Sequence, residues 1–295
     1  LNDLCRALIK RGFTVLVLTY RPLQTKVSWQ MHEREKGLEI IRIPYLPNLF
    51  YKLVNKPILE FIYLLPGLFF VTPYLLFSKP IDIIHAHGLV AGFVGVFWGK
   101  IFGKKIIIST HSIYNFPKMG IYPSFVKFIF KNSDYLLGLS NQATNEIESL
   151  GINKEKIKKF TYWIDLEKFK KIADAKDKLG WKEEFVVLFV GRLVLEKGVE
   201  LLLQSAKFWD KKINLKIVGS GPLENKVKEV AEKFPNVDFI GGVDSDNLPL
   251  YYSGSDLLIV PSIHEEGFGR VILEALACGT PVVAAKRGAI VEAMD

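Results

Sequence analysis

Cysteine is scarce in this chain of 295 residues, which holds only Cys5 and Cys278, far apart in the sequence. Two distant thiols exclude a disulfide scaffold and a CxxC metal or redox site, and they favour a reducing compartment. Walker A, nucleophile-elbow and HExxH motifs are also absent. No initiator methionine or signal peptide opens the chain. Because it begins within a helical pattern and stops abruptly, we expect a fragment that lacks both natural termini.

Acidic residues are outnumbered, because 39 Lys and Arg stand against 31 Asp and Glu and leave a net charge of +8. Much of the excess lies in residues 151–182, which hold ten lysines and five acidic residues. A basic surface can attract nucleic acid, anionic lipid or a phosphorylated substrate, and it is also compatible with a plain solvated face. No recognised nucleic-acid-binding motif is present, so we expect no nucleic-acid partner.

Short apolar runs rich in β-branched residues alternate with helical patterns along the whole chain. Continuous apolar runs are typical of strands buried on both faces, and their alternation with helices predicts parallel sheets. Ten such runs are too many for one compact half, so we expect two α/β domains, residues 1–170 and 171–295. The predicted strands are 14–20, 38–44, 81–87, 104–110, 134–140, 185–191, 214–220, 237–242, 256–262 and 280–285.

Residues 57–79 form a long apolar run in a chain whose mean hydropathy, +0.19, is high for a soluble protein. The length suits a transmembrane helix, but Pro66 and Pro73 interrupt the run and Glu60 lies inside it. Residues 45–77 contain nine Phe or Tyr and three charged residues. Three interpretations stay open: a membrane span, a core or surface helix pair, and an interfacial membrane-docking helix.

The most informative motif is PSIHEEGFGRVILEALACGTPVVA, which indicates a strand, a glycine-bearing loop, a helix of about two turns and another strand. Gly267 and Gly269 stand where the helix begins, so backbone N–H groups can approach a ligand and the helix end favours an anion. Glu266 lies in the loop and Glu274 inside the helix. Two such carboxylates suit a polyhydroxylated ligand with a phosphate between them, although an isolated pair would be ordinary surface residues.

Two weaker motifs follow other predicted strands of the second half. Arg192 and Lys197 would flank the mouth of a sheet, where open α/β folds bind ligands, and two cations there can neutralise a diphosphate. Gly219 and Gly221 belong to the sequence VGSGP, which fits a plain turn as well as a nucleotide loop.

Histidines and one acidic motif complete the candidates. His111 at the end of a strand suits a sugar contact or an acid–base group, although a lone histidine is usually structural. His85 and His87 have no evident third ligand, so a metal site is not expected. Residues 244–246, Asp-Ser-Asp, fit the DxD pattern of metal-dependent sugar transferases, but helix capping explains them better because a helix is predicted to begin near Leu248.

Taken in order, these motifs resemble those of the group 1, or family 4, retaining glycosyltransferases with the GT-B fold, over nearly the whole chain. The E-x7-E region that ends the series is the most specific of them. The resemblance implies an α/β protein with two Rossmann-like parallel-sheet domains facing a cleft, the first strand and the C-terminal part being missing. The motifs are HAHG (85–88), STH (109–111), SNQATNEIESLGINKEKIKKFTYWIDLEKF (140–169), VGRLVLEKG (190–198), VGSGP (218–222), FIGGV (239–243) and PSIHEEGFGRVILEALACGTPVVAA (261–285).

The resemblance also implies roles for ten residues, around a donor that is a UDP-, GDP- or ADP-sugar, with no metal and no further cofactor. Two are catalytic and contact the transferred sugar, five bind the donor diphosphate through side chains or backbone amides, and three lie at the ribose and the nucleotide. In that order they are Glu266 and His111; Arg192, Lys197, Gly267, Phe268 and Gly269; and Glu274, Gly219 and Gly221.

We therefore expect a cytoplasmic enzyme that moves a sugar from a nucleoside-diphosphate sugar to a glycan or lipid-linked acceptor, with retention at the anomeric carbon. The aromatic segment and the lysine excess favour a cell-envelope precursor as the acceptor and an anionic membrane surface as a partner. The alternatives are a soluble acceptor, a non-catalytic nucleotide-sugar-binding scaffold, and a GT-B epimerase or phosphorylase.

Overall fold

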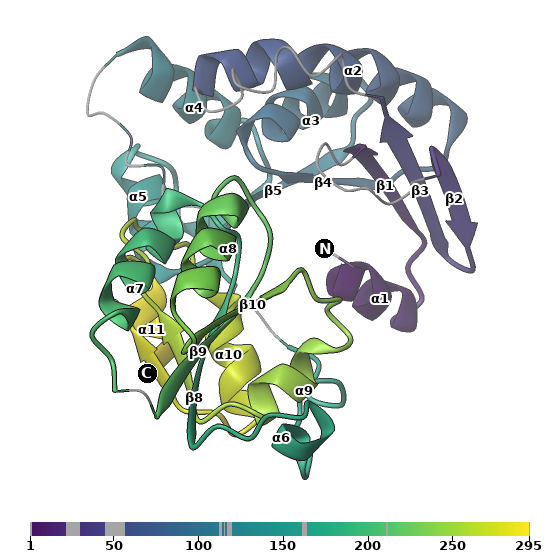
Figure 1. The fold of residues 1–295 in the computed structure, drawn as a ribbon. Coiled ribbons are helices and arrows are strands. Elements are labelled where there is room, and N and C mark those ends of the chain that lie inside the picture. The colour runs from purple at the N-terminus through teal and green to yellow at the C-terminus, as the bar shows by residue number, and fades with distance from the viewer. Residues whose placement is uncertain are drawn as a thin grey trace. The chain divides into compact units, whose positions relative to one another are not determined.

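The structure is a computed structural model that describes residues 2–21, 30–44, 57–111, 114, 116, 120–160, 164–210 and 212–294. Residues 45–56 of the aromatic-rich segment lie outside these ranges. The chain divides into two compact units, which are described one by one (Figure 1). The first unit is Leu1–Thr110, Phe116–Leu137 and Glu148–Lys158, and the second is His111–Asn115, Gly138–Ile147 and Lys159–Asp295.

The first unit holds two sheets, ordered β1-β3-β2 and β4-β5-β6-β7. Strands β1 and β3 pair in parallel, as do β4 and β5, whereas β2 pairs with β3 in an antiparallel direction. Helices α2, α3 and α4 lie side by side on one side of these strands (Figure 1). The elements are α1 (Asn2–Lys10), β1 (Val15–Tyr20), β2 (His32–Glu35), β3 (Leu38–Ile43), α2 (Pro57–Ser78), β4 (Ile83–His87), α3 (Leu89–Ile101), β5 (Lys105–Thr110), α4 (Ile121–Lys131), β6 (Tyr135–Gly138), the 3-10 turn η2 (Lys154–Lys156) and β7 (Ile157–Lys159).

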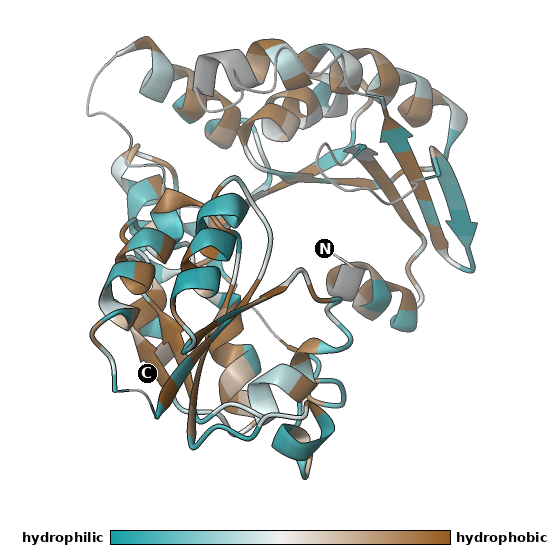
Figure 2. Ribbon diagram, in the orientation of Figure 1, coloured by the Kyte–Doolittle hydropathy of each residue, from teal (hydrophilic) through white to brown (hydrophobic). Residues whose placement is uncertain are grey.

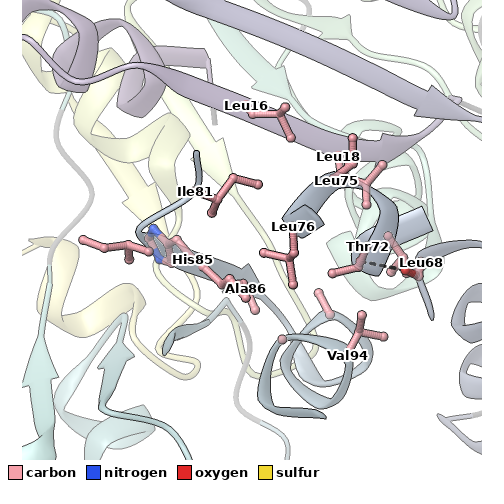
Figure 3. Close-up of a pocket in the computed structure, with 14 residues that line it drawn as sticks. Leu16, Leu18, Leu68, Thr72, Leu75, Leu76, Ile81, His85, Ala86 and Val94 are labelled. Carbon is pink, nitrogen blue, oxygen red and sulfur yellow. Dashed lines mark hydrogen bonds between the residues drawn. The ribbon is translucent and has the colours of Figure 1, made fainter. Parts of the chain in front are cut away.

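β1 and β4 are edge strands of their respective sheets, and within the described part of the chain neither pairs with another strand on its outer side. An apolar cavity of about 140 Å³ lies beside them. Figure 3 shows Leu16 and Leu18 of β1, Leu75 and Leu76 of α2 and Ala86 of β4 around this space. One side of α2 is therefore part of the interior of the first unit.

The long apolar run forms one continuous helix, α2, which contains both Pro66 and Pro73. Of the three interpretations left open for this run, the helix pair is wrong. Within the described residues α2 is the one helix that is long and apolar enough to cross a membrane, judged by length and composition alone. Helix α2 also contacts α3 and lines a cavity with residues of the neighbouring strands, and such contacts favour a surface helix over a membrane span.

The second unit contains a five-stranded parallel sheet in the order β10-β9-β8-β11-β12. Strand β8 is buried on both faces: Leu188 packs into one apolar cluster, and Val187 and Phe189 pack into the other. This arrangement explains why its sequence is continuously apolar. The elements are α5 (Asn141–Ser149), α6 (Ala175–Lys178), β8 (Phe185–Val190), the 3-10 turn η3 (Leu195–Lys197), α7 (Val199–Ala206), β9 (Ile213–Val218), α8 (Glu224–Lys233), β10 (Val237–Gly241), α9 (Leu248–Ser253), β11 (Leu257–Val260), α10 (Arg270–Ala277), β12 (Val282–Ala284) and α11 (Ile290–Met294).

All ten predicted strands are present, and two short ones, β2 and β7, were not predicted. The capping interpretation of residues 244–246 is wrong in its detail. Helix α9 does begin at Leu248, but Asn247 is its N-cap and no side chain caps it. Asp246 instead accepts a hydrogen bond from Lys168 at 2.6 Å. This bond links the segment before α6 to the loop before α9.

Candidate functional site

A cavity of about 310 Å³ opens at the carboxyl ends of β8 and β11 in the second unit. Ligands of open α/β sheets bind at this edge because the loops that follow the strands surround it. The structure brings seven of the ten predicted site residues together in its lining. They are His111, Arg192, Lys197, Glu266, Gly267, Phe268 and Gly269.

Glu266, in the loop between β11 and α10, is only 7% exposed. Its Oε1 atom accepts hydrogen bonds from the Lys197 ammonium and, at 2.5 Å, from the Ser262 hydroxyl. Burial alone raises the pKa of this carboxyl, but the two hydrogen bonds and the charge of Lys197 outweigh burial, and the pKa of Glu266 is lowered. Glu266 is therefore ionised at neutral pH. No donor from the described residues contacts its Oε2 atom, so that oxygen can accept a ligand hydroxyl.

Arg192 and His111 are the other two predicted site residues with polar side chains in the cavity lining. Arg192 is exposed, and its guanidinium has no hydrogen bond or ion pair with any residue that the structure describes. Such a cation at the cavity wall suits an anionic ligand. Burial lowers the pKa of His111, so its imidazole is neutral at pH 7 and offers one donor and one acceptor nitrogen.

The loops that carry these side chains are fastened to one another through their backbones. The carbonyl oxygen of Glu196 accepts hydrogen bonds from the Ile263 amide and from His264 Nδ1, both at 3.0 Å. The amide of Ala289 donates to the carbonyl oxygen of Glu266 at 2.9 Å. The two contacts of Glu196 hold the turn η3, which bears Lys197, against the loop that bears Glu266. The Ala289 contact holds the same loop against the segment before α11.

Gly267 is required by a close approach of two backbones. A Cβ atom at this position would lie 2.4 Å from the carbonyl oxygen of His111, which is far inside a normal contact. Next to it, Phe268 is buried in the core and anchors the loop, and Gly269 is the N-cap of α10 without any side-chain cap. The Ile272 amide donates to the Gly269 carbonyl oxygen at 2.9 Å. The positive end of the α10 dipole lies at the cavity lining and favours an anion there.

Glu274, predicted to bind ribose hydroxyls, does not line the cavity. It contacts Arg270, which does line it. Arg270 Nε donates to its Oε1 atom and the Tyr252 hydroxyl donates to its Oε2 atom, each at 2.9 Å. Burial raises the pKa of Glu274, while Tyr252 and Arg270 act in the opposite direction. The pKa of Tyr252 is raised well above 10 by burial and by Glu274, so its hydroxyl keeps its proton and donates.

Gly219 and Gly221 also lie outside the cavity lining, in the loop after β9. A Cβ atom on Gly219 would collide with the Gly191 carbonyl oxygen, and one on Gly221 with the backbone of Leu193. Leu193 donates a backbone hydrogen bond to Ser220 at 2.9 Å. The two glycines therefore allow the β9 loop to pack against the loop that carries Arg192.

Ser262, Arg270 and Tyr252 belong to the site and were not predicted. Arg270 could have been found, because it stands four residues before Glu274 on a predicted helix and the two side chains share a face. Ser262 lies in a loop, and Tyr252 contacts Glu274 from another helix, so no local pattern identifies either. Within the described ranges no group of three or more His, Cys, Asp or Glu could hold a metal ion.

Comparison with known proteins identifies the class. The family model described as Glycosyltransferase Family 4 matches residues 1–168, and the one described as Glycosyl transferases group 1 matches residues 171–295. A relative from Klebsiella pneumoniae, described as an uncharacterized 41.2 kDa protein in the cps region, is 32% identical over 75% of this chain and 64% of its own length. The chain thus spans less than two thirds of that relative.

Two solved structures share the fold. Sucrose-phosphate synthase from Thermosynechococcus elongatus has a TM-score of 0.76 at 25% identity, covering 97% of this chain and 74% of that protein. Anabaena HepE in complex with UDP has a TM-score of 0.67 at 23% identity, covering 84% and 73%. The two parallel-sheet units are those of a GT-B glycosyltransferase. The chain belongs to Glycosyltransferase Family 4.

Proposed function

We propose that the complete protein transfers a sugar from a nucleoside-diphosphate sugar to an acceptor hydroxyl, with retention at the anomeric carbon. One observation carries this proposal: an ionised Glu266, a neutral His111 and the exposed cation Arg192 share the cavity at the carboxyl edge of the second sheet. A carboxylate and an imidazole suit sugar hydroxyls, and a guanidinium suits the diphosphate.

In this reaction the bond between the anomeric carbon and the diphosphate oxygen breaks, and its electron pair leaves with the diphosphate. Arg192, Lys197 and the backbone amides of Gly267–Gly269 would stabilise that negative charge. The acceptor oxygen would form the new bond to the anomeric carbon and pass its proton to the departing diphosphate. Glu266, held by Lys197 and Ser262, would orient the sugar through its second oxygen. His111 would contact the same sugar as donor or acceptor.

The donor is proposed to be a UDP-, GDP- or ADP-sugar, used without a metal ion or further cofactor. Glu274 is proposed to accept hydrogen bonds from the ribose, and Gly219 and Gly221 to lie beside the nucleotide. The bound UDP in the Anabaena neighbour is consistent with this class of donor.

The acceptor is proposed to be a lipid-linked or cell-envelope glycan precursor at the inner face of a membrane. The lysine excess and the apolar helix α2 support this location. A soluble acceptor is the alternative, and transfer assays that offer lipid-linked and soluble glycans to the same preparation distinguish the two. An epimerase would interconvert donors without any acceptor, and a scaffold would bind the donor without turnover.

The first experiment is a thermal-shift panel of UDP, GDP, ADP and their sugar conjugates on the complete protein, without metal. A nucleotide at about 100 times its Kd stabilises by about 2.7 kcal/mol, which corresponds to a rise in Tm of about 5–10 °C. We expect one base to be selected and Arg192→Ala to abolish the shift and reduce donor turnover by about 100-fold.

Arg11→Ala is the matched control, because Arg11 is an exposed arginine that follows α1 in the first unit. It should leave both the shift and the turnover unchanged. Unaltered turnover in Arg192→Ala would contradict the proposed role of this residue. Absence of any nucleotide shift in a folded sample would favour the scaffold.

A further inference from the structure

The outward side of α2 carries a regular stripe of large apolar side chains. Ile62, Phe70, Tyr74 and Phe77 are all exposed, with Phe70 at 74% and Phe77 at 87%. Their spacing of eight, four and three residues places them on one face of the helix. The segment Phe61–Ser78 contains no charged residue and has a mean hydropathy of 1.7. A soluble helix normally exposes polar residues on this face, so the stripe requires an explanation.

The opposite side of α2 is already occupied by the first unit. Leu68, Leu75 and Leu76 point into the cavity beside β1 and β4 (Figure 3). The Trp98 indole donates to the Phe69 carbonyl oxygen at 2.8 Å, which ties α2 to α3. Packing along its inner side places α2 on the surface of the first unit, which favours a surface helix over a span.

The apolar surface continues from α2 onto α3. The ring of Phe69 contacts Phe70 at 5.8 Å and Phe97 at 5.1 Å between centroids, and Phe97 is exposed. Ile101, one turn beyond Phe97, is 62% exposed. We call the exposed set Ile62, Phe70, Tyr74, Phe77, Phe97 and Ile101 the apolar ridge. In Figure 2 helix α2 is coloured largely hydrophobic, whereas α8 of the second unit is strongly hydrophilic.

The charge of the surrounding helices has a single sign. Residues 83–133, which include α3 and α4, contain six lysines and no Asp or Glu. Lys100 is exposed between Phe97 and Ile101, and Lys127 and Lys131 are exposed on α4, which packs against α3. An apolar surface with exposed lysines on the neighbouring helices is complementary to an anionic bilayer, where lysines reach the head groups and aromatic rings enter the interface.

From this combination we infer that the apolar ridge and the lysines of α3 and α4 form a docking surface for an anionic lipid bilayer. Lysine is depleted at interfaces between proteins, so an apolar surface bordered by lysines fits lipid better than a protein partner. The inference deepens the proposed function, on which it rests for its purpose: the docked first unit would hold the enzyme beside a lipid-linked acceptor. It names the face and the residues that make contact.

The test measures co-sedimentation of the complete protein with vesicles of phosphatidylcholine, alone and with about 30% phosphatidylglycerol. We expect binding to the anionic vesicles that weakens as salt is raised. Phe77→Gln should weaken it by about tenfold, because one phenyl ring no longer enters the interface. Phe208→Gln is the matched control, since Phe208 is 88% exposed just beyond α7 in the second unit. This variant should bind as the parent does.

Each contrary outcome overturns the inference. Folded protein that ignores anionic vesicles, or equal binding by Phe77→Gln and the parent, would do so. A dimer that Phe77→Gln converts to a monomer would assign the ridge to a second copy of the chain. The nucleotide thermal shift is measured on the same samples. If the shift is present but vesicle binding is absent, the docking inference alone is wrong. If vesicle binding is present but no nucleotide shifts Tm, the donor proposal alone is wrong.

Discussion

Tyr252 and Glu274 provide the sharpest test of how the second unit holds its candidate ribose ligand. The Tyr252 side chain is fully buried, and its hydroxyl donates to Glu274 Oε2 at 2.9 Å. Tyr252→Phe removes this donor and leaves the ring, so the packing of the core around it is kept. Glu274 then keeps the hydrogen bond that Arg270 Nε donates to its Oε1 atom.

The expected cost follows from the burial and charge of the pair. A hydrogen bond to a charged group contributes about 1.5–3 kcal/mol, and Glu274 is too buried for water to replace the donor freely. We therefore expect Tm to fall by about 3–10 °C. The missing donor also raises the pKa of Glu274 further, since Tyr252 acts to lower it. The hydrogen bond favours the ionised carboxylate, so the loss grows as pH rises through that raised pKa and shrinks below it.

The assay is thermal unfolding of parent and variant between about pH 5 and pH 8, with nucleotide affinity measured in parallel. Tyr251→Phe is the matched control: it makes the same change one residue earlier, where the described residues offer the hydroxyl no hydrogen-bond partner. It should shift Tm by less than about 1 °C. Equal effects of the two substitutions, or a loss in Tyr252→Phe that does not depend on pH, would refute the reasoning. Weaker nucleotide binding in Tyr252→Phe alone would support the ribose role of Glu274.

Two further predictions concern the neighbouring loop. Ser262→Ala removes a hydrogen-bond donor to Glu266 and so raises the pKa of that carboxyl. Turnover should fall by about tenfold, and the acid limb of the pH–rate profile should move to higher pH. Ser262→Thr keeps the hydroxyl and should leave both the rate and the pH profile near the parent values. An unchanged pH profile in Ser262→Ala would contradict this account. Gly267→Ala should lower Tm and abolish turnover, because the new Cβ atom would collide with the His111 carbonyl oxygen. Gly242→Ala is the control: a Cβ atom there meets open space, so Tm and turnover should not change. Equal Tm values for the two variants would contradict the predicted collision.

The sequence determined the order of the main elements because their apolar runs are local signals. Strand β8 is recognisable from its own residues, since both of its faces are buried. Strand β2 is not, because its residues, His32–Glu35, are polar and mostly exposed. It pairs with β3, and Glu33 accepts hydrogen bonds from Arg42 at 2.7 Å, a partner nine residues away. Pairing with the adjacent strand β3 across the turn Lys36-Gly37, and not the propensity of its own polar residues, makes this segment a strand.

The candidate site divides in the same way. Loop glycines after a strand and before a helix indicate an anion site from local chemistry alone, and Arg192 needs only its place at a strand end. Tertiary structure decided that Lys197 reaches Glu266 across 69 residues and that Ser262 shares the same oxygen. It also decided which side of α2 faces the interior and which side stays exposed. Helical spacing divides a helix into faces, but a helix that is apolar all round does not specify the face to be buried, and only the packing against β1, β4 and α3 selects it.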